Sequence, residues 1–237
     1  MNGDNVTPLV GLGCFPAGNF ALVRMILVSS AMDAYRPECV APLYTLTLGV
    51  PEIGCGACHD GAMTWIAPDV ARGPRTDMAC GEREMLDNWL KLRRVFLLRK
   101  CAGLTAEQLK IASVEPSGLT LLGILRHMAA VERSWFREKY LHEDLPELYS
   151  TEEHPNGDFD LVADADAEAD YAAFLAETAA CDAAVAGRDL DEPADDPLAP
   201  TGEVSLRWVY LHILEEYAQH TGHADFIRER IDGATGA

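Results

Sequence analysis

Residues 212–225 read HILEEYAQHTGHAD and show helical periodicity. With about 100° per residue, a helix sector of roughly 80° holds four ionisable side chains, namely His212, Glu216, His220 and His223. The same side carries apolar side chains, namely Val209, Ile213, Ala224 and Ile227. The stripe of histidine and glutamate therefore lies on a face that should be buried, although unpartnered polar groups are costly to bury.

A divalent metal ion is a suitable partner for this stripe. Burying the Glu216 carboxylate without a partner costs several kcal/mol, and a bound cation removes that cost. Glu216 and His220 are one helical turn apart, so both side chains can reach one ion. The alternative is that the two side chains form a hydrogen-bonded pair within the helix.

A third ligand is available on an earlier helical segment. His127 shares its face with Ile124, Val131 and Trp135. A lone histidine on an apolar face is more often a core residue than a ligand, so His127 is a candidate only together with the pair. Three ligands from two helices leave an open coordination position, which is typical of a catalytic rather than a structural site.

The two remaining histidines of the stripe have less direct roles. We interpret His212 as a core residue or a support for the ligands, and His223 as a neighbour that forms hydrogen bonds near the site. Either side chain is a candidate for proton transfer in catalysis. The ligand set suits Zn²⁺, with Ni²⁺, Fe²⁺ and Mn²⁺ as alternatives. The sequence indicates no residues that bind a further cofactor.

Amphipathic segments predict four helices, at about 82–101, 118–140, 166–186 and 204–232. Ser117 is the expected N-cap of the second helix, and Gly233 ends the fourth. The piece Thr105–Leu109 has the pattern of one capped turn, and a Pro/Asp-rich loop over 189–201 precedes the last helix. Because no segment has convincing strand periodicity, we predict an all-α four-helix bundle over 63–237.

Residues 1–62 have a different composition, rich in Gly, Pro and Cys and without helical period. We expect an irregular N-terminal extension, with Met63 near the natural start. Cys55-Gly-Ala-Cys58-His59 matches a haem-attachment pattern, but the motif is short and haem attachment follows export. The seven cysteines show no disulfide framework, and neither an export signal nor a membrane span is visible. Free thiols and a cytoplasmic location are therefore expected.

The chain is strongly acidic, with a net charge of −19. Half of its 38 acidic residues lie between Glu143 and Glu203, where Arg188 is the single basic residue. Phosphate binding needs clustered Lys and Arg, so the composition argues against nucleic acid and against anionic membranes as partners. We expect the acidic segment to be a solvated outer face, because nothing basic in it could neutralise the charge; a docking surface is the alternative.

The order of these motifs resembles the DinB-like superfamily of four-helix metalloenzymes over about residues 64–237. The similarity lies in residues 125–132, LRHMAAVE, and in residues 216–223, EYAQHTGH. In that superfamily a histidine on the second helix and two ligands one turn apart on the last helix hold a metal. The resemblance thus implies the ligands His127, Glu216 and His220. Many members have histidine in place of Glu216; in this respect the chain is similar to mycothiol-dependent maleylpyruvate isomerase.

Two functions remain open. Some members of the superfamily are S-transferases that use mycothiol or bacillithiol, which implies a metal-dependent S-transferase or isomerase acting on a small molecule with a low-molecular-weight thiol. Hydrolysis by metal-bound water is a variant of this enzyme hypothesis. The alternative is a non-catalytic metal-binding bundle that acts as an interaction or stress-response module. A homodimer is one form that it could take. An open cavity beside the triad favours the enzyme, and a sealed fourth position favours the structural role.

Overall fold

Four long helical segments build the part of the chain that the computed structural model describes, residues 64–236 without 74–76 and 198. They are α1 (Glu82–Cys101), α3 (Leu121–Glu132) continued by the π-helix η1 (Arg133–Lys139), α5 (Ala167–Ala184) and α6 (Leu206–Asp232). Shorter elements are α2 (Ala106–Leu109), α4 (Gly157–Asp160), β1 (Pro193–Asp195) and β2 (Glu203–Ser205). The predicted all-α bundle is confirmed. The predicted extension over 1–62, with Cys55 and Cys58, lies outside the described residues.

Local capping accounts for several of the described helix ends. Thr105 and Gln108 form a reciprocal capping box at the start of α2, as the capped-turn prediction required. The Ser205 side chain accepts a hydrogen bond from the Trp208 N–H at the start of α6. Gly233 ends α6 with a φ of 79°, a left-handed conformation that favours glycine.

The second long helix differs from its prediction at both ends. The N-cap is Thr120 and not Ser117, because the Thr120 hydroxyl accepts from the Gly123 N–H, whereas Ser117 only closes a local turn with the Leu119 N–H. The last seven residues of the segment form the π-helix η1. There the Tyr140 N–H donates to the carbonyl of Trp135, five residues earlier.

The expectation of a fold without strands is wrong at one place. β1 lies in the predicted loop and β2 at the predicted start of the fourth helix, and the two pair as a short antiparallel hairpin, with Ala194 opposite Val204. Val204 is buried, and the strand β2 runs directly into α6 at its cap, Ser205. The hairpin is too short to show alternation in the sequence, which is why periodicity did not reveal it.

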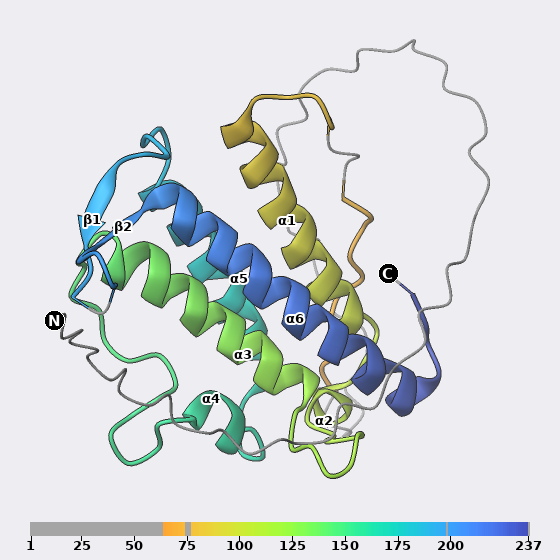
Figure 1. Ribbon diagram of the computed structural model, residues 1–237. Helices are drawn as coiled ribbons and strands as arrows, with labels where there is room; N and C mark the ends of the chain where they lie inside the picture. The colour runs from red at the N-terminus through yellow and green to blue at the C-terminus, as the bar shows by residue number, and fades with distance from the viewer. Residues whose placement is uncertain (1–63, 74–76, 198, 237) are drawn as a thin grey trace, which may run out of the picture. The chain divides into compact units, whose positions relative to one another are not determined.

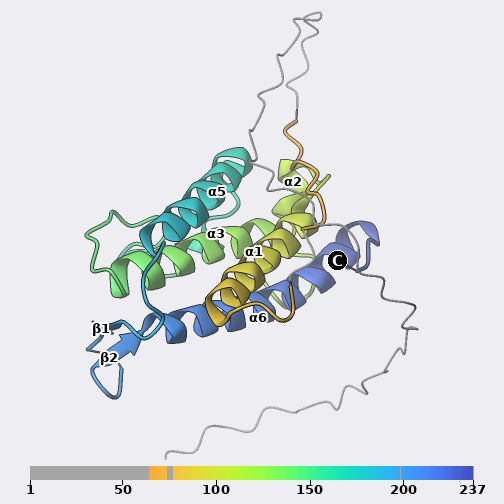
Figure 2. The same cartoon turned by 90° about the horizontal axis from the view of Figure 1, so that it is seen from above.

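The helices pack as two neighbouring pairs, α1 with α6 and α3 with α5, and α3 also packs against α6 (Figure 1 and Figure 2). The apolar residues of the α6 stripe are all buried, as predicted, namely Val209, Ile213, Ala224 and Ile227. The contact between α3 and α6 joins the helices that carry the predicted ligands, because His127 lies on α3 and Glu216 and His220 lie on α6. No described helix has the length and apolar character to cross a membrane.

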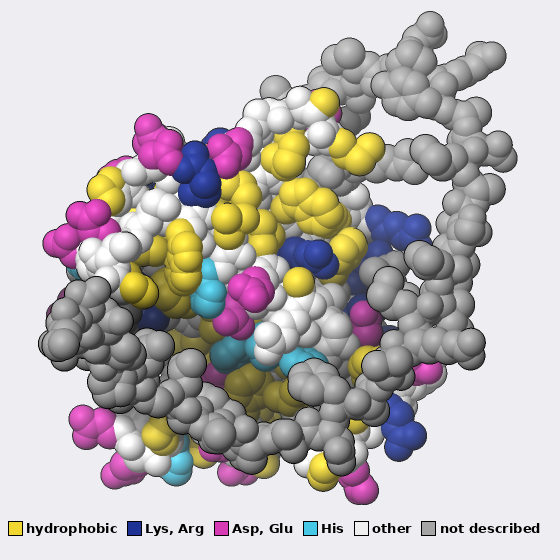
Figure 3. Space-filling model, in the orientation of Figure 1, with side chains coloured by type: hydrophobic (Ala, Val, Ile, Leu, Met, Phe, Trp, Pro, Cys, Tyr) yellow, Lys and Arg dark blue, Asp and Glu magenta, His cyan; other side chains and the backbone are white. Residues whose placement is uncertain are grey.

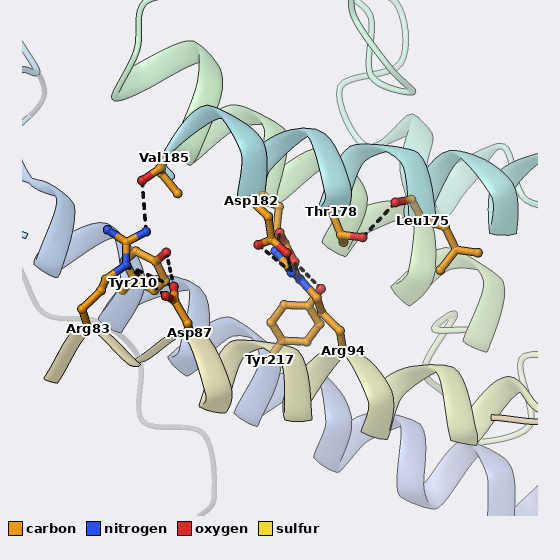
Figure 4. A network of polar contacts seen from close by, with 10 residues as sticks. Arg83, Asp87, Arg94, Leu175, Thr178, Asp182, Val185, Tyr210 and Tyr217 are labelled. Carbon is orange, nitrogen blue, oxygen red and sulfur yellow. Dashed lines mark hydrogen bonds and ion pairs between the residues drawn. The ribbon is translucent and has the colours of Figure 1, made fainter. Parts of the chain in front are cut away.

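A buried polar network joins all four long helices (Figure 4). The guanidinium of Arg94 on α1 forms two hydrogen bonds to the Glu132 carboxylate on α3, at 2.8 and 2.5 Å. It also pairs with Asp182 on α5 at 2.8 Å, and the Tyr217 hydroxyl on α6 donates to Glu132 at 2.5 Å. Burial and the neighbouring Glu132 carboxylate raise the pKa of Tyr217 well above its usual value, against the opposing effect of Arg94, so Tyr217 keeps its proton. The buried carboxylate of Glu132 is therefore hydrogen-bonded to both Arg94 and Tyr217.

The prediction for the acidic segment holds for most residues but fails at particular positions. Asp170 on α5 is buried, and it pairs with Arg126 on α3 at 2.8 Å. Glu177 on α5 pairs with Arg137 on η1 at 3.1 Å. The basic partners come from other helices, so a search for neutralising residues within the segment could not find them.

Candidate metal centre

Three sequence-predicted ligands converge where α3 meets α6. One donor atom from each of His127, Glu216 and His220 lies within 4.8 Å of the other two. Donor atoms around a tetrahedral zinc, at about 2.0–2.2 Å from the metal, lie roughly 3.4 Å from one another. Side-chain rotations that move the donor atoms by about 1 Å would therefore bring this set to the geometry of a zinc site. The residues present fit a divalent ion.

The helix spacing places Glu216 between two histidines of α6. Its carboxylate oxygens lie 3.6 Å from the Nε2 atoms of both His212 and His220. Burial, together with the neighbouring His127 and His223, lowers the pKa of His220 to about 4. His220 is therefore neutral at physiological pH, which is the protonation state that a metal ligand needs.

His127 has a carboxylate partner that the sequence did not reveal. The Asp158 Oδ2 atom lies 2.7 Å from the His127 Nδ1 atom, and the Asp158 side chain is 9% exposed. A carboxylate at Nδ1 fixes the orientation of the ring and leaves Nε2 free to bind a metal ion. This arrangement is common around zinc-binding histidines. Asp158 is thus a candidate support residue for the site.

Neighbouring residues hold Asp158 in position. Arg126, which precedes His127 in the sequence, donates hydrogen bonds to the carbonyls of Gly157 and Asp158 at 3.0 and 3.1 Å. A Cβ atom on Gly157 would lie 2.2 Å from the carbonyl oxygen of Tyr149, so only glycine fits there. Asp158 is one of many acids in its segment, and the only sequence signal near it is the Asn-Gly turn at 156–157.

The two remaining stripe histidines occupy different surroundings. The Nδ1 atoms of His220 and His223 are buried and have no hydrogen-bond partner among the described residues, and their rings lie 5.3 Å apart. Such unpaired buried atoms are rare and indicate a missing water, ion or ligand. The His212 ring instead contacts both Trp135 and Trp208, with ring centroids 4.4 and 4.9 Å away. The proton-transfer roles suggested for His212 and His223 stay predictions.

A cavity of about 470 Å³ lies beside the cluster and includes His127 and Asp158 in its lining. Its volume is within the range of about 300–1,000 Å³ that small-molecule sites occupy. Figure 3 shows histidine and acidic side chains beside a hollow with hydrophobic side chains on its floor. His142 and His154, which the stripe argument left out, are exposed on the surface.

Asp158→Ala should weaken zinc binding by about 10–100-fold, the usual cost of losing a carboxylate that orients a ligand histidine. Zinc affinity is measured by competition with a chromophoric chelator. Asp160→Ala is the matched control, because Asp160 lies in the same short helix α4 and is exposed. Equal affinities of the two variants would show that Asp158 does not support His127 as a ligand.

An all-α bundle with a histidine–glutamate cluster on two facing helices defines a DinB-like helical protein with a candidate metal centre. Residues 85–233 match the mycothiol-S-transferase family, a DinB-like family, and the chain belongs to it. The match spans α1 to α6 and includes every residue of the cluster. Neither the curated proteins nor the solved structures contain a match to the chain.

Proposed function

We propose that this protein is a divalent-metal-dependent transferase that attaches a small thiol, such as mycothiol, to an electrophilic substrate. The cavity that opens at His127 beside the donor set carries this proposal, because a purely structural metal site needs no adjoining space for a ligand. Membership of the mycothiol-S-transferase family supports the thiol. Isomerisation assisted by the thiol, or hydrolysis, would use the same site.

In this proposal His127, Glu216 and His220 hold the ion, and Asp158 orients His127. A divalent metal bound there would lower the pKa of a coordinating thiol, so that the thiol is present as thiolate near neutral pH. Zn²⁺ suits two imidazoles and a carboxylate, and Ni²⁺, Fe²⁺ and Mn²⁺ are the alternatives. His223, whose Nδ1 atom lies buried beside His220 without a partner among the described residues, is the candidate to receive the thiol proton.

The lining of the cavity at His127 suits a polar thiol. It includes side chains that donate or accept hydrogen bonds, among them Ser134, Glu138, Tyr149 and Asn156. Groups of this kind fix the orientation of a small ligand in a pocket. A thiol that carries hydroxyl and amide groups would find partners here, whereas a purely aliphatic thiol would leave these groups unpaired.

The test is a thiol-consumption assay with zinc-loaded protein, a set of electrophiles, and mycothiol, glutathione or cysteine as the thiol. We expect consumption above the uncatalysed rate with at least one thiol, and loss of this activity in His220→Ala. Metal content is measured in parallel by elemental analysis. One tightly bound equivalent of metal without turnover of any thiol would favour the second candidate, a non-catalytic bundle in which the ion ties α3 to α6.

A further inference from the structure

A second cavity, of about 530 Å³, lies where the β1–β2 hairpin meets η1 and the first turn of α6. Its lining includes Trp135 and Lys139 of η1, Trp208 of α6, Val204 and Ser205 of β2, and two acidic residues of the hairpin, Asp196 and Glu203. This volume also falls within the range of about 300–1,000 Å³ for small-molecule sites. Trp135 and Lys139 line the cavity at His127 as well, so η1 forms a shared wall.

Aromatic rings dominate one side of this hairpin cavity. The rings of Trp135 and Trp208 lie 5.0 Å apart, and His212 stacks on Trp208 at 4.9 Å with an interplanar angle of 12°. Trp208 remains 46% exposed. A large aromatic side chain left half exposed beside a cavity is typical of a surface that buries itself against a ligand.

The π-helix supplies an independent indication. Single π-helical turns are rare and are frequently found at functional sites. Here the turn brings the Lys139 ammonium to 3.7 Å from the centre of the Trp135 ring. Lys139 is the one cation in the described lining, whereas Asp196 and Glu203 are acidic, so an anionic group has a favourable position only at Lys139. The cavity therefore combines aromatic surface with a single positively charged position. The Ser205 hydroxyl, which accepts from the Trp208 N–H, can still donate its own proton.

The hairpin cavity also connects to the candidate metal centre. Its Trp208 ring stacks on His212, and the His212 Nε2 atom lies 3.6 Å from the Glu216 carboxylate. A molecule held against Trp208 would thus be separated from the proposed ligand Glu216 by two side chains, Trp208 and His212. The other cavity contacts the cluster through His127 and Asp158.

We infer that the hairpin cavity binds a planar aromatic molecule with an anionic or hydrogen-bond-accepting substituent, with its ring on Trp208 and its substituent at Lys139 and Ser205. The role of this molecule as the electrophile that receives the thiol rests on the proposed function. The binding itself does not, because it needs neither metal nor thiol.

The probe is 2-naphthoate, a rigid planar carboxylate that does not react with thiols, and binding to the full chain is measured by titration calorimetry. Trp208→Ala should weaken binding at least about tenfold, since it removes one stacking surface. Trp89→Ala is the matched control: Trp89 is 41% exposed and carries a cation at 5.5 Å from its ring centre, Arg93, but does not line the cavity. It should bind the probe as the unchanged protein does.

A second probe and a third variant distinguish failure of this inference from failure of the proposed function. Cyclohexanecarboxylate, which has the same charge but no flat ring, should bind at least about tenfold more weakly than 2-naphthoate. His220→Ala should lose metal but keep 2-naphthoate affinity, so that a failed thiol assay with intact probe binding would refute the proposed function alone. The inference is overturned if 2-naphthoate does not bind at millimolar concentration, or if Trp208→Ala and Trp89→Ala bind it equally.

Discussion

His220→Ala should abolish tight metal binding by the purified protein. His220 is the most buried of the three proposed ligands, and its neutral imidazole lies within 4.8 Å of the donor atoms of His127 and Glu216. Loss of a direct ligand should cost more than the 10–100-fold that loss of a supporting residue costs, so we expect at least about 100-fold weaker binding. Metal content after dialysis and a chelator competition measure the effect.

The other two ligands should give graded effects. His127→Ala should behave like His220→Ala, whereas Glu216→Gln keeps an oxygen donor but loses the ligand charge, and should therefore weaken binding less. His142→Ala and His154→Ala are controls for the general removal of histidine, because both residues are exposed and outside the cluster. If His127→Ala and His220→Ala both kept one equivalent of tightly bound metal, these residues would be core groups, and the enzyme proposal would fall with the metal site.

Arg94→Leu should lower the free energy of unfolding by about 3–5 kcal/mol. The reason is the Glu132 carboxylate, whose side chain is 0% exposed and which takes its two charged hydrogen bonds from Arg94. Without the guanidinium, a buried negative charge keeps only the hydroxyl of Tyr217. Urea unfolding followed by circular dichroism measures the change.

Two variants test whether this effect comes from the buried charge. Arg188→Leu removes an exposed ion pair with Glu192 and should change stability by less than about 1 kcal/mol. The double variant Arg94→Leu/Glu132→Leu should recover part of the loss, because an apolar pair often replaces a buried ion pair without great cost. A change below about 1 kcal/mol for Arg94→Leu would mean that water reaches Glu132 in its place.

The same network has a consequence for the metal centre. Tyr217 follows Glu216 directly on α6, and Glu132 lies on the same helix as His127. Their hydrogen bond therefore joins the two helices that carry the proposed ligands, close to those ligands in sequence. A rigid contact of this kind keeps ligand positions within the narrow range that metal binding requires.

The sequence alone determined the helical segments and the face that each one buries. Periodicity is a local property: the 100° step places Glu216 and His220 on the same side of α6 whatever surrounds the helix. Local caps, such as Thr105 and Gly233, act in the same way, since they satisfy backbone groups within a few residues. The two buried faces also predicted that His127 would meet Glu216 and His220. They did not predict the distances between the three donor atoms.

Only the tertiary structure decided what surrounds these residues. Asp158 reaches His127 because Arg126 holds the backbone of α4 and because Gly157 leaves room for Tyr149. The π-helix and the hairpin, which together bring Trp135 beside Trp208, likewise have no periodic signal. Contacts of this kind join segments that are distant in the chain, and their energies depend on packing between elements. No pattern within a single helix records them, because a helix repeats only the geometry of its own backbone.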